Sequence, residues 1–80
     1  MTTRALLLAF IDGYITQNSW APSIREMCAG IGVASTSSVA YQLGVLEDLG
    51  HIERQGDTPR ALRITKQGAE VLKRHKAARV

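Results

Sequence analysis

The chain has 80 residues, which is short for two average domains, so we expect one small domain. Apolar residues make up 45% of it and charged residues 21%, a composition typical of folded globular proteins and not of disordered ones. Cys28 is the single cysteine, which excludes an intrachain disulfide and a metal site built from cysteine pairs. The longest apolar run, residues 5–11, is far shorter than the ~20 residues of a membrane span. We therefore expect a cytoplasmic protein with no membrane association.

The net charge of +3 is unevenly distributed along the chain. Residues 1–50 contain two basic and four acidic side chains, whereas residues 51–80 contain eight basic and three acidic ones. This positive last third is expected if that part of the protein faces a polyanion such as a nucleic acid.

The first half of the chain predicts two helices. Apolar residues recur at helical spacing between Arg4 and Gln17, which predicts a first helix. Ser23, followed three residues later by Glu26, is typical of a capping box and predicts the start of a second helix. Four apolar residues at helical spacing form the core-facing side of that helix: Ile24, Met27, Cys28 and Ile31.

A third helix follows after a very short connection. Glycines at 30 and 32 can end the second helix, and Ser35 can cap the next one, which runs over 36–49 until Gly50 stops it. Two helices joined by a short turn that contains glycine form a helix-turn-helix.

Beyond Gly50 the apolar spacing changes to two. Residues 51–54 and 60–64 are predicted strands, and the turn-forming residues 55–59 between them predict a hairpin. We therefore predict a mainly α fold with a small β-hairpin, a winged helix-turn-helix over residues 1–64. Thr65 can cap a further helix over 66–76, although Gly68 weakens it, and residues 65–80 form a C-terminal helix and basic tail that could serve dimerisation.

The third predicted helix has a polar side with small residues. Opposite its apolar stripe it presents Ser37, Ala40, Tyr41, Gly44 and Asp48, flanked by Ser38 and Val45. A face of this kind can enter a major groove, where serine hydroxyls meet base edges and alanine contacts a thymine methyl group. The alternative is that the serines cap helices. For Ser35 alone we favour capping, and for Ser37, Ser38 and Tyr41 together we favour DNA contact.

Arginines of the hairpin supply a second candidate set, namely Arg54, Arg60 and Arg63. Exposed arginines beside a recognition helix can hold phosphates or enter the minor groove. Alternatively, they pair with Glu53 or Asp57 on a solvated strand face. Arg25, at the start of the second helix, suits a contact with the DNA backbone or a pair with a nearby carboxylate.

An enzyme is not expected. Neither histidine has a cysteine or carboxylate at metal-ligand spacing, and no nucleophile motif or phosphate-binding glycine loop is present. Cys28 is interpreted as a core residue because it lies on an apolar stripe. We predict no metal, no cofactor and no small-molecule ligand.

The residues described above resemble a known family. Residues 21–27 and 32–43, with Leu46, Glu47, Gly50, Ile52 and residues 59–61, are similar to the DNA-binding domain of LexA-type SOS repressors, in the form found in actinobacteria, and the similarity covers residues 5–64. That family reads operator DNA with the third helix of a winged helix-turn-helix. The resemblance implies base contacts from Ser35, Ser37, Ser38, Ala40 and Tyr41, and backbone contacts from Ser23, Arg25 and Arg60. The predicted DNA-binding set also includes Thr36, Gln42, Arg54 and Arg63.

The sequence departs from the family's pattern in three ways. Tyr41 stands where close relatives tend to have histidine, and Gly44 where a basic residue is usual, so the operator need not be the family's own. The chain also stops at Val80, where the family continues into a self-cleaving protease domain, so we expect no self-cleavage.

Together these features predict a sequence-specific regulator of transcription that binds double-stranded DNA, a repressor carried by a phage or mobile element and acting as a homodimer. Two alternatives are a winged-helix module that binds proteins, as an antirepressor or adaptor does, and an architectural factor that bends DNA during excision. The near absence of lysine and arginine on the third helix makes the adaptor a credible alternative.

Overall fold

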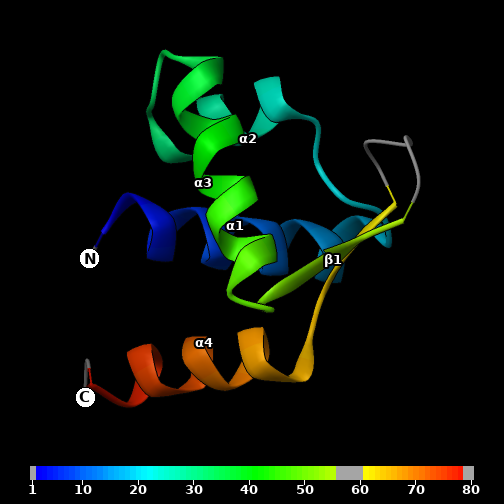
Figure 1. The fold of residues 1–80 in the computed structure, drawn as a ribbon, viewed down its shortest axis with the longest axis vertical. Helices are drawn as coiled ribbons and strands as arrows, with labels where there is room; N and C mark the ends of the chain where they lie inside the picture. Colours follow the sequence, from blue (N-terminus) through cyan, green and yellow to red (C-terminus); the bar gives the residue numbers. More distant parts are fainter. Residues whose placement is uncertain (1, 56–60, 79–80) are drawn as a thin grey trace.

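The computed structural model describes residues 2–55 and 61–78, and for residues 75–78 it describes the backbone only. The elements follow in the order α1 (Thr3–Asn18), α2 (Ile24–Ile31), α3 (Thr36–Asp48), β1 (Ile52–Arg54), β2 (Leu62–Ile64) and α4 (Lys66–Ala78). Figure 1 shows α2 above α1, α3 running from above α1 downward across it, α4 below both, and the hairpin at one side. The predicted winged helix-turn-helix with an added C-terminal helix is confirmed.

Helix α1 packs against each of the helices α2, α3 and α4. At its start, the Thr2 hydroxyl accepts a hydrogen bond of 3.1 Å from the Ala5 amide. This contact stabilises the helix start, because it satisfies a first-turn amide that would otherwise have no partner. The helix ends at Ser19, whose φ of 69° places it in the left-handed region. The buried side of α1 consists of Ala5, Leu7, Leu8 and Ile11.

The turn between α2 and α3 has the predicted caps. The Ser23 hydroxyl accepts from the Glu26 amide at 3.1 Å, and the Glu26 carboxylate accepts from the Ser23 amide at 2.9 Å, which completes the capping box. At the other end of α2, Gly32 has a φ of 75°, a conformation that glycine adopts without the Cβ penalty of other residues. Tyr14 donates a hydrogen bond of 2.5 Å to Glu26, which ties α2 to α1.

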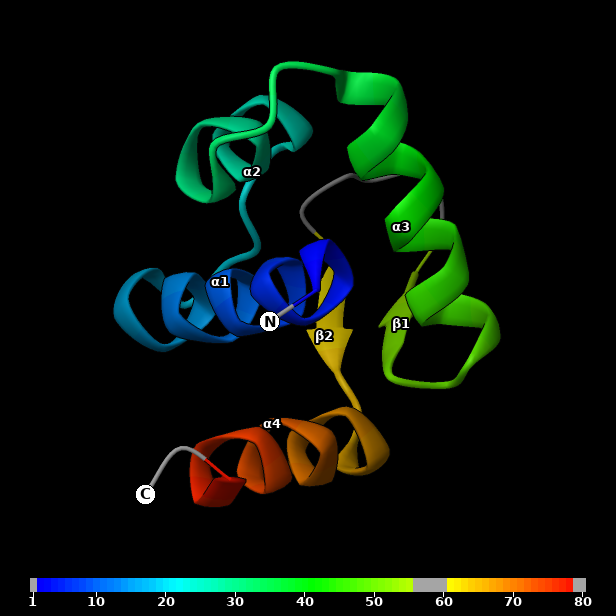
Figure 2. The same cartoon turned by 90° about the vertical axis from the view of Figure 1, so that its left-hand side faces the viewer.

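Three fully buried side chains fix the orientation of α3: Val39, Leu43 and Leu46. Burial of each stabilises the fold by about 1.5–3 kcal/mol, so rotation of the helix about its axis would cost several kcal/mol. The opposite side of α3 is thereby held toward solvent, as Figure 2 shows from the side.

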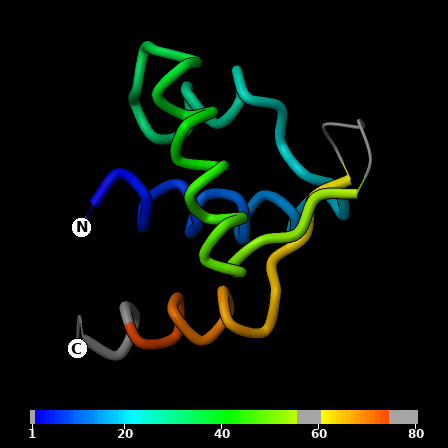
Figure 3. The backbone as a smooth tube through the Cα atoms, viewed as in Figure 1, coloured from blue at the N-terminus to red at the C-terminus, as the bar shows by residue number. Residues whose placement is uncertain are grey.

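The hairpin follows α3 after a tight turn, whose path Figure 3 traces. Its strands are antiparallel, with Ile52 opposite Ile64, Glu53 opposite Arg63 and Arg54 opposite Leu62. Ile52 and Leu62 are buried, whereas Glu53 and Arg63 are exposed on the outer face. The alternation read from the sequence is confirmed, with shorter strands than predicted.

Helix α4 is fastened to the turn between α3 and β1. The Thr65 amide donates to the His51 carbonyl at 3.0 Å, and the Thr65 hydroxyl donates to the Gly50 carbonyl at 2.5 Å. Gly68 lies directly against the His51 carbonyl, where a Cβ atom would overlap the oxygen. Gly68 lowers the intrinsic helix propensity of α4, but it is also the residue that lets α4 pack closely against the His51 carbonyl.

The apolar residues of α4 belong to the core of the same chain. Leu72 is 6% exposed and lies in the cluster formed by α1, α3 and the hairpin, and Val71 packs against that cluster. Both residues therefore pack within the domain. They are not free to form a dimer interface.

Candidate nucleic-acid interface

The outward side of α3 is an exposed and mostly polar helix face. Thr36, Ser37, Ser38, Ala40 and Tyr41 are all exposed, and Tyr41 reaches 68%. Small side chains in the first two turns let a partner approach the helix backbone closely, and the tyrosine stands beyond them. A surface of this shape, on a helix held by a buried opposite side, matches what a major groove admits.

Ser35 has a structural use as well. Its hydroxyl accepts a hydrogen bond of 3.3 Å from the Ser38 amide, so it caps α3. The capping interpretation favoured for Ser35 is thus seen in the structure. Its side chain is nevertheless exposed at the end of α3 that carries the other serines.

Gln42 lies on one flank of this face and is only partly buried. Its side-chain oxygen accepts a hydrogen bond of 3.0 Å from Nε of Arg4, in the first turn of α1. This contact connects two segments 38 residues apart in sequence. It places a cation beside the reading face that the sequence analysis did not identify.

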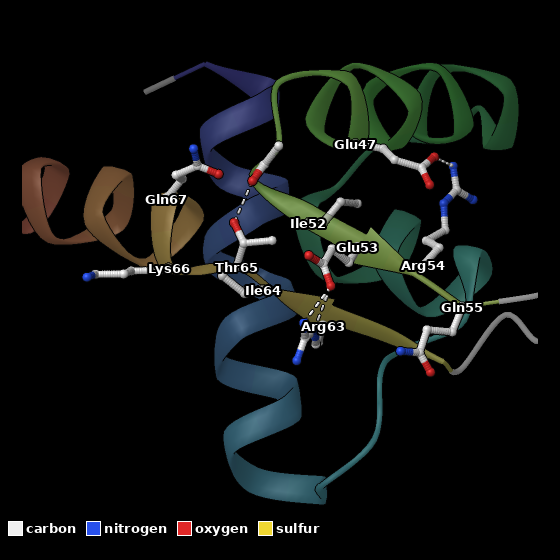
Figure 4. Close-up of a pocket in the computed structure, with 11 residues that line it drawn as sticks. Glu47, Ile52, Glu53, Arg54, Gln55, Arg63, Ile64, Thr65, Lys66 and Gln67 are labelled. Atoms are coloured by element: carbon white, nitrogen blue, oxygen red, sulfur yellow. Dashed lines mark hydrogen bonds and ion pairs between the residues drawn. The ribbon is translucent and has the colours of Figure 1, made fainter.

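The other flank of α3 meets the hairpin. Arg54, at the end of β1, pairs with Glu47 of α3 at 3.4 Å, and Figure 4 shows the two side chains pointing toward one another. Arg54 therefore lies beside α3, and a carboxylate partly neutralises it. Both side chains remain partly exposed, at 35% and 44%, so the pair is open to solvent.

Arg63 is placed differently from Arg54. It pairs with Glu53 across the strands, with 2.6 Å from Nη2 and 2.8 Å from Nε to the same carboxylate oxygen. This pair lies on the outer face of the hairpin (Figure 4), so the structure does not bring Arg63 to α3. Arg60 lies outside the described residues.

The predicted contacts of α2 are at its first turn. Ser23 is partly buried and its hydroxyl serves the capping box, whereas Arg25 projects into solvent. Arg25 is thus accessible to a ligand at the start of the helix that precedes α3.

A shallow hollow lies beside the hairpin, between the end of α3 and the start of α4 (Figure 4). Four of the five charged residues in its described lining are paired, Glu47 with Arg54 and Glu53 with Arg63, and Lys66 is the fifth. Paired charges of this kind offer a small ligand no converging set of polar groups. Among residues 2–55 and 61–74, whose side chains the structure describes, no cluster of three or more histidine, cysteine or acidic side chains could hold a metal ion. No helix within residues 2–55 and 61–78 is long and apolar enough to span a membrane.

Comparison with known proteins identifies this arrangement. A family model described as the LexA DNA binding domain matches residues 2–61. The chain belongs to the LexA DNA-binding domain family. The match spans the helix-turn-helix and β1, and α4 lies beyond it.

Relatives of this LexA-type domain are repressors of greater length. The chain is 38% identical over 63 residues to the LexA repressor of Carboxydothermus hydrogenoformans, and the match covers 79% of the chain and 31% of the relative. It is 38% identical over 74 residues to that of Roseiflexus sp., covering 92% and 34%, and 43% identical over 58 residues to that of Clostridium novyi, covering 72% and 28%. The matched region spans about a third of these relatives.

Two charged residues that contact side chains beside or on α3 are absent from the site residues predicted from the sequence. Arg4 appeared only as the first residue of a helix, and Glu47 only among the residues that resemble the family. The signal for Arg4 was a cation in the first turn of a helix, where the helix dipole disfavours positive charge. Its partner is 38 residues away, so no local pattern could indicate the contact.

Proposed function

We propose that this chain is a sequence-specific regulator of transcription that binds double-stranded DNA inside the cell and represses by occupying its operator. Helix α3 reads base edges in the major groove, and Arg54, Arg60 and Arg25 hold the backbone. The observation that carries the proposal is the exposed face of α3, with its serines and Tyr41, held outward by a buried opposite side. The names of the relatives support repression.

The test begins with duplexes selected from a random pool by the wild-type protein. Ser37→Glu places a carboxylate against the base edges and the phosphates, and we expect it to abolish binding of the selected duplex. Gln17→Glu is the matched control, because it adds the same charge at an exposed position of the far end of α1. Normal binding of the selected duplex by Ser37→Glu would show that α3 is not the reading helix.

A second candidate function is supported by the charge of α3. The helix contains no lysine or arginine and ends in Glu47 and Asp48, and its largest exposed side chain is Tyr41. A protein-binding module, such as an antirepressor or adaptor, would use such a surface. Salt titration separates the two functions, because DNA binding through Z phosphates weakens with a slope of about −0.9Z in log salt. An adaptor would show no duplex affinity above background.

We further propose that the protein acts as a homodimer on a two-fold symmetric site. One winged helix buries roughly 600–1,000 Å² on DNA, and specific affinity generally needs two half-sites. Because Leu72 is part of the core, the interface is better tested at the exposed Ala69 of α4. We expect a dimer in sedimentation at micromolar concentration that Ala69→Glu weakens. A wild-type monomer that protects a single half-site would refute the proposal.

A further inference from the structure

Arg4 extends from the first turn of α1 to the flank of α3. Its Nε atom donates to Oε1 of Gln42 at 3.0 Å, and both side chains lie at the surface. Gln42 comes one helical turn after Ser38 and directly after Tyr41, both of which are exposed on the reading face. The contact therefore lies at the edge of the surface that the proposed function assigns to DNA.

The geometry of this contact determines which groups remain for a ligand. Arginine only donates hydrogen bonds, so the oxygen of the Gln42 amide must face it, and the amide nitrogen turns away. The guanidinium has five N–H groups in one plane, and the bond to Gln42 uses the one on Nε. In the part of the chain that the structure describes, the two terminal nitrogens have no protein acceptor. The exposed edge of the pair therefore consists of donors alone, which suits the oxygens of a phosphate.

Local electrostatics does not explain a cation at this position. The N-terminal turn of a helix carries partial positive charge, so Arg4 is mildly unfavourable there in the free protein. It is also one of two basic residues among the first 50, a segment with four acidic residues. A phosphate at this position would be attracted by both the guanidinium and the first turn of α1.

The location fits one wall of a major groove. The groove is about 12 Å wide and a helix with its side chains about 10–12 Å, so the flanks of an inserted helix face the two phosphate backbones. Gln42 and Glu47 point about 140° apart around α3 at 3.6 residues per turn. Arg54 approaches from the Glu47 side and Arg4 from the Gln42 side, and Figure 1 shows α3 between the start of α1 and the hairpin.

We propose that Arg4, oriented by Gln42, binds a DNA phosphate on the flank of α3 opposite the hairpin. The inference rests on the proposed function, since it adds a fourth backbone anchor, after Arg54, Arg60 and Arg25, to the same interface. Gln42 acts as a positioning residue, and its amide nitrogen donates to the same backbone.

The experiment compares Arg4→Gln with Arg74→Gln, which removes the same charge from an exposed position in the C-terminal half of α4, a segment that runs away from α3 (Figure 2). The probes are a duplex selected from a random pool by the wild type and a scrambled duplex of the same length. We expect Arg4→Gln to weaken both by roughly tenfold and to make the salt slope shallower by about 0.9, with an unchanged melting temperature. Arg74→Gln should bind like the wild type.

Gln42→Ala tests the positioning role. We expect Gln42→Ala to lose less affinity than Arg4→Gln does. We also expect Arg4→Gln to cost less affinity in the Gln42→Ala background than in the wild type, because the two residues act together. Equal affinities and salt slopes for Arg4→Gln and Arg74→Gln would overturn the assignment of Arg4, and strict additivity would overturn the role of Gln42. If the wild type bound neither duplex above background, the proposed function would be refuted, and with it the roles of Arg4 and Gln42.

Discussion

Replacing Gly68 with alanine distinguishes local helix propensity from tertiary packing, because the two predict opposite signs. Glycine in a helix interior is about 1 kcal/mol less favourable than alanine, so propensity alone predicts that Gly68→Ala stabilises α4. In the structure, the added Cβ would overlap the His51 carbonyl oxygen and lie 3.0 Å from Cγ2 of Ile64. The carbonyl cannot move aside freely, since it accepts the hydrogen bond from the Thr65 amide at 3.0 Å.

The expected size follows from these contacts. Overpacking against fixed backbone costs about 1–3 kcal/mol, and displacement of α4 would also expose part of Leu72, which is now 6% exposed. We take the upper part of that range, about 3 kcal/mol, and subtract the propensity gain of about 1 kcal/mol. Gly68→Ala should therefore destabilise the fold by about 2 kcal/mol. For a domain of this size the melting temperature would fall by about 10 °C.

Gly13→Ala is the matched control. Gly13 is an exposed residue inside α1, and a Cβ atom there would meet nothing within 4 Å. Propensity should act alone at this position and stabilise the fold by about 1 kcal/mol. Thermal and urea unfolding followed by circular dichroism would measure both variants. A Gly68→Ala protein that melts at or above the wild-type temperature would refute the close packing of α4 on the turn.

Three further outcomes are expected. Glu47→Gln frees Arg54 from its partner, so affinity for any duplex should rise about threefold and the salt slope of binding should steepen by about 0.9. The unfolding free energy should change by less than about 0.5 kcal/mol, and an unchanged salt slope would place Arg54 away from DNA. Gly30→Ala brings a Cβ against the ring of Phe10, and because that neighbour is a side chain that can rotate, the loss measured by urea unfolding should be about 1 kcal/mol, less than for Gly68. Ser19→Gly relieves a left-handed φ of 69° and should stabilise the fold by about 1 kcal/mol; a lower urea midpoint would contradict this.

The elements and the exposed polar side of α3 were predictable because their signals are local. The Ser23 and Glu26 pair, the glycine at 32 and the apolar spacing of α3 each act within a few residues of the chain, and all appear in the structure as predicted. The same holds for the exposure of Ser37 and Tyr41, since a buried stripe at helical spacing leaves the opposite side outward.

The charged surroundings of α3 were not predictable in the same way. The sequence grouped Arg54 with Arg63, but strand alternation within the folded hairpin separates them: Arg54 meets Glu47, and Arg63 meets Glu53 on the outer face. Which arginine reaches the helix depends on how the hairpin packs.

The sequence by itself determined the order of the helices, the hairpin and the polar side of α3, because hydrophobic periodicity and caps are properties of neighbouring residues. Only the tertiary structure decided that Arg4 reaches Gln42 and that Gly68 is needed against His51. The physical reason is distance along the chain. These contacts join residues 17 to 38 positions apart, and their existence depends on how whole elements pack rather than on any local pattern.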